Sequence, residues 1–307
     1  METGYNIYQA LKAKNEVTVG NIGVRINSQY GKGSIEATST VTPTSKFGVP
    51  FKDTDYSYFL SLFEKWPEVN GLHSHVGSQG MDLRAMVQGA KFIVDLADRI
   101  NRDLGRRQIT VIDIGGGLPV DYHRDGSNHL PAMYSELLRE EVPRLFSGDF
   151  TVITEFGRWV VANAGWFASR IEYTKVAGGV LVGITHAGGN MFVREVYMPS
   201  TWYHPITVYD QTGHLLKGDC VVASIAGPLC FSGDLIVRER KLPRFEQGDY
   251  AVYHHTGAYS ISMYSLYNCI SAPPVYFYSI DPENGNVTTR LIKREMTIED
   301  ISSFWSV

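Results

Sequence analysis

Cysteine is scarce in this chain of 307 residues, which has three: Cys220, Cys230 and Cys269. Three thiols cannot form the disulfide framework of a small secreted domain, and no two of them have metal-site spacing. An excess of cationic residues is also missing, because 28 lysines and arginines stand against 32 acidic residues. This balance gives no reason to expect nucleic acid or a membrane surface as a partner. We expect a cytoplasmic protein that acts on a small molecule.

Long apolar runs are absent as well. No stretch approaches the roughly 18 residues of a membrane-spanning helix, and residues 1–17 lack the basic and apolar segments of a secretory signal. The sequence also contains no internal repeat and no low-complexity segment. The hydrophobic share of 44% and the charged share of 20% are those of an ordinary globular protein. The length favours two domains.

The first half alternates short β-branched runs with amphipathic helical patterns, which is typical of βα units that build a parallel sheet. We expect strands at residues 22–26, 71–76, 109–114 and 151–155. Helices are predicted over residues 55–65, from Leu83 to a cap at Gly105, and from Pro131 to Val142.

The second half lacks helical patterns after about Trp166. Short strand-like segments, such as residues 179–184, 220–223 and 275–279, are separated there by glycine and polar turns. A capping-box pattern from Thr297 to Asp300 indicates one short final helix. The sequence therefore predicts an α/β domain over residues 1–165 and an all-β domain over residues 166–307.

Polar residues follow each expected strand of the first domain. In a βα barrel the catalytic groups lie at the carboxyl ends of the strands. The first strand ends near Arg25, and the others end in His73-Ser-His75-Val-Gly-Ser78, Asp113-Ile-Gly115-Gly116-Gly117 and Glu155-Phe-Gly157-Arg158. These side chains are the candidates for a functional site.

Each of these motifs has a second interpretation. Consecutive glycines suit a bound phosphate, which Arg158 would also hold, but a tight turn requires glycine too. His73 and His75 lie on one strand face and would serve a divalent metal, or simply form hydrogen bonds within the core. A carboxylate such as Glu155 is rarely buried without a partner. Residue types alone leave these interpretations open.

Six motifs succeed one another along the chain: Ser45-Lys-Phe-Gly48, Gly71-Leu-His-Ser-His-Val-Gly-Ser-Gln79, Asp113-Ile-Gly-Gly-Gly117, Glu155-Phe-Gly-Arg158, Gly227-Pro-Leu-Cys-Phe-Ser-Gly-Asp234 and Gly257-Ala-Tyr259. In this order they resemble the motifs of the pyridoxal-phosphate-dependent ornithine/diaminopimelate/arginine decarboxylases, which have the alanine-racemase-like fold. The resemblance implies that residues 1–165 are the second half of a pyridoxal-phosphate-binding (β/α)8 TIM-type barrel. Residues 166–307 would be the C-terminal β-barrel or β-sandwich domain.

The resemblance also implies roles for individual residues. His75 would stack on the pyridine ring of pyridoxal 5'-phosphate, Glu155 would bind the pyridine nitrogen, and Arg25 would lie close to the cofactor. The phosphate ligands would be Ser78, Gly115, Gly116, Gly117, Arg158 and Tyr259. The catalytic residues would be Cys230, as a proton donor, together with His75 and Glu155. The substrate ligands would be Arg194, Tyr197 and Asp234, although the stretch from Arg194 to Pro205 is about two residues longer than in the family.

The family assembles as homodimers with shared active sites, so the loop carrying Cys230 and Asp234 would enter the partner subunit's site. The preferred function is an amino-acid decarboxylase, a carbon–carbon lyase similar to the diaminopimelate decarboxylases of lysine biosynthesis. One alternative is a non-catalytic homologue that binds or regulates partners. Another is a metal-dependent barrel hydrolase that uses His73 and His75. The cofactor-type residues at strand ends favour the decarboxylase.

The chain departs from the family in four places. No Tyr-x-x-Lys motif with the family's cofactor-binding lysine occurs, so we expect that lysine and the first half of the barrel upstream of Met1, and an inactive chain as given. Phe231 replaces the usual glutamate after the loop cysteine, and Phe156 replaces a proline. An Arg-Pro-rich stretch is replaced by residues 269–274. These changes suggest a side branch that acts on a modified or carrier-linked amino acid.

Overall fold

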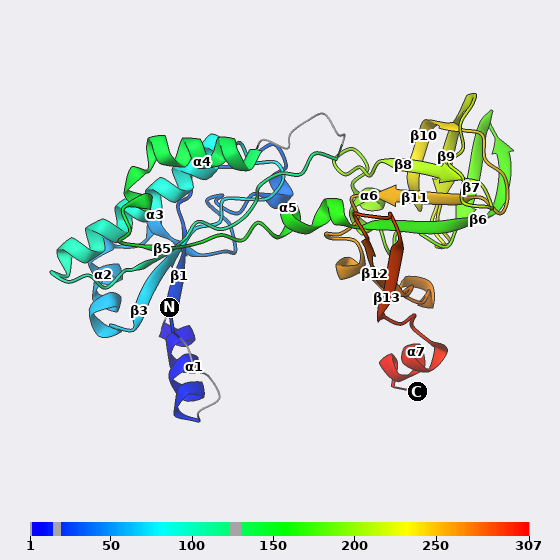
Figure 1. Ribbon diagram of the computed structural model, residues 1–307. Helices are drawn as coiled ribbons and strands as arrows, with labels where there is room; N and C mark the ends of the chain where they lie inside the picture. The colour runs from blue at the N-terminus through cyan, green and yellow to red at the C-terminus, as the bar shows by residue number, and fades with distance from the viewer. Residues whose placement is uncertain (1, 15–19, 123–129, 307) are drawn as a thin grey trace. The chain divides into compact units, whose positions relative to one another are not determined.

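The computed structural model describes residues 2–14, 20–122 and 130–306. They divide into two compact units, Met1–Val160 and Val161–Val307, whose elements are labelled in Figure 1. Each unit has a hydrophobic core of its own. None of the helices in the described ranges is both long and apolar enough to cross a membrane.

The first unit is built on a five-stranded parallel sheet with the order β2-β1-β3-β4-β5. Its strands are β1 (Ile22–Asn27), β2 (Val49–Pro50), β3 (Val69–His73), β4 (Val111–Asp113) and β5 (Thr151–Ile153). The helices are α1 (Glu2–Ala13), α2 (Tyr56–Lys65), α3 (Leu83–Asp103), α4 (Leu130–Glu141) and α5 (Gly157–Val161). Short 3-10 turns cover Glu36–Thr38, Phe51–Asp53 and Pro143–Phe146.

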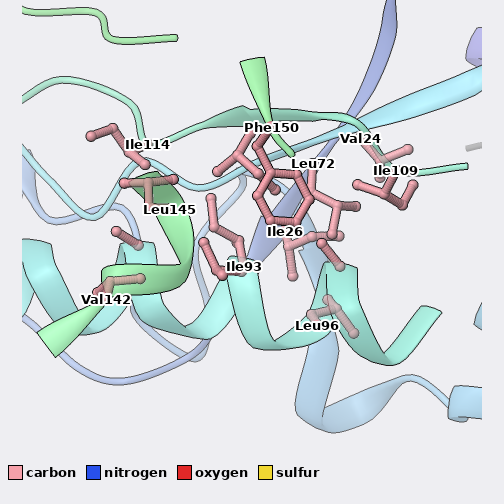
Figure 2. Close-up of a cluster of buried hydrophobic side chains, with 14 of the residues drawn as sticks. Val24, Ile26, Leu72, Ile93, Leu96, Ile109, Ile114, Val142, Leu145 and Phe150 are labelled. Carbon is pink, nitrogen blue, oxygen red and sulfur yellow. The ribbon is translucent and has the colours of Figure 1, made fainter. Parts of the chain in front are cut away.

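Helix α3 supplies much of the core of this unit. Its side chains that face inward recur every three or four residues, and the carboxylate of Asp82 caps its first turn by accepting from the backbone N–H of Arg84 at 2.7 Å. Figure 2 shows Ile93 and Leu96 of α3 in one cluster with Leu72 of β3. The amphipathic pattern therefore fixes the face of α3 that covers the sheet.

The expected strands and helices of this unit are present, with different bounds. The strand expected at residues 71–76 begins at Val69 and ends at His73, and those expected at 109–114 and 151–155 are three residues long. The chain leaves the sheet soon after the last paired apolar residues, so the polar motifs lie in the loops that follow. Strand β2 was not predicted, because two residues carry no periodicity.

The second unit contains a six-stranded mixed sheet with the order β10-β9-β7-β6-β11-β8. These strands are β6 (Trp166–Ala177), β7 (Val180–Thr185), β8 (Ile206–Tyr209), β9 (Cys220–Ala226), β10 (Leu235–Pro243) and β11 (Tyr250–His254). Strands β12 (Val275–Ile280) and β13 (Val287–Lys293) form a separate antiparallel ribbon. The 3-10 turns here are Ala162–Ala164, Ile261–Met263 and Tyr267–Cys269.

Two short helices complete the second unit, α6 (Val193–Tyr197) and α7 (Ile298–Phe304). The capping box predicted for the final helix is confirmed, because Thr297 and Asp300 exchange side-chain and backbone hydrogen bonds. Helix α6 was not predicted, since five residues are too few for a helical pattern. Phe192, which precedes it, is fully buried beside Tyr253 of β11.

Replacing Ile93 with alanine is expected to lower the free energy of unfolding by about 2–5 kcal/mol, because the side chain is fully buried on α3 and its removal leaves a cavity. Asp95→Ala, on the exposed side of the same helix, is the matched control and should cost less than about 1 kcal/mol. Urea unfolding monitored by circular dichroism measures both. Equal losses in the two variants would contradict this account of the core.

Candidate active site

The parallel register of the first unit places polar residues of different strands in one row. Arg25 of β1 pairs with His73 of β3, His73 pairs with Asp113 of β4, and Asp113 pairs with Ile153 of β5. Since parallel strands end at the same edge of a sheet, the loops that follow converge there. The strand ends predicted from the sequence therefore meet in space.

Glu155 lies two residues beyond the end of β5. Its backbone N–H donates to the carbonyl of Gly115 at 2.9 Å, which ties the loop after β5 to the glycine turn after β4. The carboxylate Oε2 lies 3.4 Å from Nε2 of His73 and 3.9 Å from Nδ1 of His75. Because its side chain is 48% exposed, this carboxylate is accessible to a ligand while facing two imidazoles.

His75 is held in one orientation by the glycine turn. The backbone N–H of Gly116 donates to its Nδ1 at 2.9 Å, so in the neutral ring the proton resides on Nε2. Burial lowers the pKa of His75, and the positive charge of Arg25 lowers it further, while Glu155 opposes both effects. The site therefore presents a neutral, fixed imidazole.

Arg25 occupies the neighbouring strand end. Its guanidinium lies over the ring of Phe47, 4.4 Å from the centroid, and Nη2 donates to the carbonyl of His75 at 3.4 Å. Burial lowers the pKa of Arg25, whereas the carboxylates of Glu155 and Asp113 raise it. The result is a cation held beside the two carboxylates by an aromatic ring.

Arg158 of α5 is almost completely buried, with 6% of its surface exposed. Its Nη1 donates to the hydroxyl of Tyr122 at 2.8 Å, and its Nη2 donates to Oγ of Ser78 at 3.5 Å. Residues that follow β3, β4 and β5 are thus joined around one guanidinium. Such a buried fork of donors is suited to an anion.

The glycines after β4 are required by close backbone contacts. A Cβ on Gly116 would lie 2.2 Å from the carbonyl oxygen of Glu155, and one on Gly117 would lie 1.9 Å from that of Gly77. Gly117 also has a φ of +98°, in the region that favours glycine. Tight packing therefore accounts for these glycines without any ligand.

The second unit holds the other predicted site residues. The guanidinium of Arg194, on α6, lies 4.6 Å from the ring centroid of Trp202 and 4.2 Å from that of Tyr259. The carboxylate of the adjacent Glu195 is buried against Nε2 of His204 at 3.0 Å. Arg194, a predicted substrate ligand, and Tyr259, a predicted ligand of the cofactor phosphate, are therefore neighbours.

Cys230 is exposed in the loop between β9 and β10. Its Sγ lies 3.6 Å from the hydroxyl of Tyr267 and accepts from the side-chain amide of Asn268 at 3.2 Å. The hydrogen bond with Tyr267, and then the one with Asn268, lowers the pKa of the Cys230 thiol. These contacts polarise the thiol and leave it exposed.

Asp234 closes the same loop from the inside. Its carboxylate accepts from the backbone N–H of Gly189 at 2.6 Å and from that of Leu229 at 2.7 Å, and only 4% of the residue is exposed. Burial raises the pKa of Asp234, and these two hydrogen bonds oppose the rise. In this chain its carboxylate shapes the loop, so its assignment as a substrate ligand rests on the family resemblance alone.

Tyr197 and Phe231 stack with centroids 5.4 Å apart and planes within 7°. This pair places the predicted substrate ligand Tyr197 beside the cysteine loop. Sequence reasoning did not identify the partners Tyr122, Tyr267 and Asn268, which lie far along the chain from the residues they contact. The one sequence signal near two of them was that residues 269–274, directly after Tyr267 and Asn268, differ from the Arg-Pro-rich stretch of the family.

The pKa of His75 is predicted to lie below about 6.5, the ordinary histidine value, and Arg25→Ala should raise it by removing a nearby positive charge. The folded chain then binds this proton less tightly than the unfolded chain. The stability that His75 contributes is therefore present above about pH 6.5 and is lost as the pH falls through the lower folded pKa. Titration of the ring by NMR measures it, and a midpoint above 6.5 in the unaltered chain would refute the prediction.

Comparisons with known proteins agree with this geometry. The family model described as "Pyridoxal-dependent decarboxylase, pyridoxal binding domain" matches residues 2–162, and that described as "Pyridoxal-dependent decarboxylase, C-terminal sheet domain" matches residues 92–257. Diaminopimelate decarboxylase of Escherichia coli strain K12 is 30% identical, over 91% of this chain and 66% of its own length. The enzyme of Buchnera aphidicola from Acyrthosiphon pisum is 28% identical, over 95% of this chain and 69% of its own length.

A solved structure of diaminopimelate decarboxylase from M. jannaschii, in complex with L-lysine, superposes with a TM-score of 0.78 at 25% identity. The match covers 95% of this chain and 65% of that protein. The chain thus spans about two thirds of the length of its relatives. These matches confirm the predicted fold class, part of a barrel domain followed by a sheet domain. The chain belongs to the pyridoxal-dependent decarboxylase family, whose cofactor is pyridoxal phosphate.

Proposed function

We propose that this chain is the larger part of a diaminopimelate decarboxylase-like enzyme, a carboxy-lyase that removes CO2 from a small amino acid in lysine biosynthesis. The observation that carries the proposal is that the loop after β5 presents both an accessible carboxylate, Glu155, which is tied to the glycine turn, and an almost fully buried cation, Arg158, which is hydrogen-bonded to Ser78. The three exposed free cysteines support the cytoplasm as its compartment.

The residues at the strand ends fit the cofactor chemically. Pyridoxal phosphate has an anionic end and a basic pyridine nitrogen, which need a cationic group and a carboxylate. Arg158 and Ser78 are hydrogen-bonded to each other, so two of the proposed phosphate ligands already lie side by side. In our proposal Ser78, Gly115, Gly116, Gly117, Arg158 and Tyr259 bind the phosphate.

Glu155 and His75 serve the ring in this proposal. The carboxylate of Glu155 holds a proton at the pyridine nitrogen, because an adjacent negative charge favours the protonated form. The neutral ring of His75, oriented by Gly116, packs against the pyridine face, and Arg25 lies beside both. When bound, the cofactor supplies an electron sink for the pair of electrons left behind as CO2 departs.

Cys230 holds the proton that replaces CO2 on the substrate carbon. Its exposure and the contacts of Sγ with Tyr267 and Asn268 support this role, because a proton donor works best when its pKa approaches the working pH. Arg194 and Tyr197 are the proposed ligands of the substrate carboxylate. The exposed loop also supports a homodimer in which Cys230 enters the site of the partner subunit, with Asp234 maintaining the loop.

Arg158→Ala is expected to weaken the binding of pyridoxal phosphate by about 1.5–3 kcal/mol, the range for a hydrogen bond to a charged group. Pyridoxal, which lacks the phosphate, should bind the unaltered chain and the Arg158→Ala variant equally. Arg107→Ala, which removes an exposed arginine of the same unit, should leave the affinity for pyridoxal phosphate unchanged. Calorimetry of the purified chain measures all of these affinities. An equal loss for pyridoxal and pyridoxal phosphate would contradict the role of Arg158.

Alkylation of Cys230 by iodoacetamide is expected to reach half its maximal rate below about pH 8.5, the ordinary thiol value. Tyr267→Phe and Asn268→Ala should each shift this midpoint upward, because each removes a hydrogen bond that favours the thiolate. Mass spectrometry of the digested chain follows Cys230, with the exposed Cys220 as an internal reference. If neither substitution moves the midpoint, the thiol is not activated by these neighbours.

A further inference from the structure

A second kind of ligand fits the same strand ends. A ring nitrogen of His73, a carboxylate oxygen of Asp113 and a carboxylate oxygen of Glu155 all lie within 4.8 Å of one another. They come from the ends of three adjacent strands, β3, β4 and β5. An ion bonded at about 2 Å to each ligand keeps its ligand atoms within about 4 Å of one another, so these three side chains need to close by less than about 1 Å to bind one ion.

His73 provides the independent observation. Its Nε2 is shielded from solvent and has no hydrogen-bond partner among the residues that the structure describes, although Oε2 of Glu155 is 3.4 Å away. A buried polar nitrogen without a partner is unfavourable. A metal ion would satisfy this nitrogen together with both carboxylates.

The charges around the cluster favour a cation. Asp113 and Glu155 carry two negative charges, and Arg25 supplies one positive charge beside them. The strand ends therefore retain a negative charge that Arg25 does not balance.

We propose that His73, Asp113 and Glu155 bind a divalent transition-metal ion of the zinc class. One imidazole and two carboxylates suit Zn2+ or Co2+, whereas Mg2+ prefers oxygen ligands alone. Three protein ligands leave further positions open to water. The ion uses Glu155, which under the proposed function also binds the pyridine nitrogen. One part of the proposal rests on that function: if Glu155 binds the pyridine nitrogen, the metal ion and the cofactor cannot be bound at the same time.

Zinc calorimetry on the whole chain, in excess Mg2+ and with the three exposed cysteines alkylated, tests the site. One Zn2+ per chain is expected. His73→Ala and Asp113→Asn should each weaken binding by about tenfold to a hundredfold or more, since loss of an outer-shell partner alone costs that much. Asn keeps the oxygen that accepts from the N–H of Gly115 at 2.9 Å in the unaltered chain, so this variant preserves the turn. His214→Ala, which removes an exposed imidazole of the second unit, should bind normally.

Visible absorption of bound Co2+ gives a second readout, and it should be lost in His73→Ala. Undiminished Zn2+ affinity in both ligand variants would overturn the site, as would equal binding of Mg2+. Addition of pyridoxal phosphate should raise the apparent Kd for Zn2+, and simultaneous binding at unchanged affinity would overturn the exclusion. If the chain binds Zn2+ through His73 and does not bind pyridoxal phosphate, the proposed function fails and the metal site stands.

Discussion

The parallel register of β1, β3, β4 and β5 is the constraint on which the functional part of this molecule depends. Hydrogen bonding between neighbouring strands puts Arg25, His73 and Asp113 in one row. A shift of one residue would turn each of these side chains to the opposite face of the sheet. The core beneath, with α3 packed on it, holds the register and so holds the charged groups together.

Electrostatics at the strand ends follows from that arrangement. Cations and carboxylates are brought close in a partly buried place, where their interactions exceed those at an exposed surface. Burial lowers the pKa of both Arg25 and His75, but the guanidinium of Arg25 stays charged, so a cation and a neutral imidazole flank Glu155. A site with this mixture can accept a ligand that carries a basic nitrogen or a metal ion.

Much of this arrangement could be predicted from the sequence, because strands that end in polar and glycine-rich motifs are readable one by one. The order of motifs also indicated the family. The lengths of β3, β4 and β5 could not be predicted, since the point at which pairing stops depends on the neighbouring strand. Nor could the inward position of Asp234, whose partners include Gly189, 45 residues away. Contacts of that kind are set by packing and leave no local pattern.

The enclosed carboxylate of Asp234 has a consequence for how the sequence can change. A Cβ on Gly188 would lie 2.6 Å from its Oδ1, and one on Gly227 would lie 2.3 Å from its Oδ2. These three positions therefore constrain one another. Loss of the carboxylate would relieve the contact at Gly188, whereas a Cβ on Gly227 would still lie 2.3 Å from the Cα of Gly188. Because Gly189 N–H is bound to the same carboxylate, the turn before α6 and the cysteine loop should evolve as one unit.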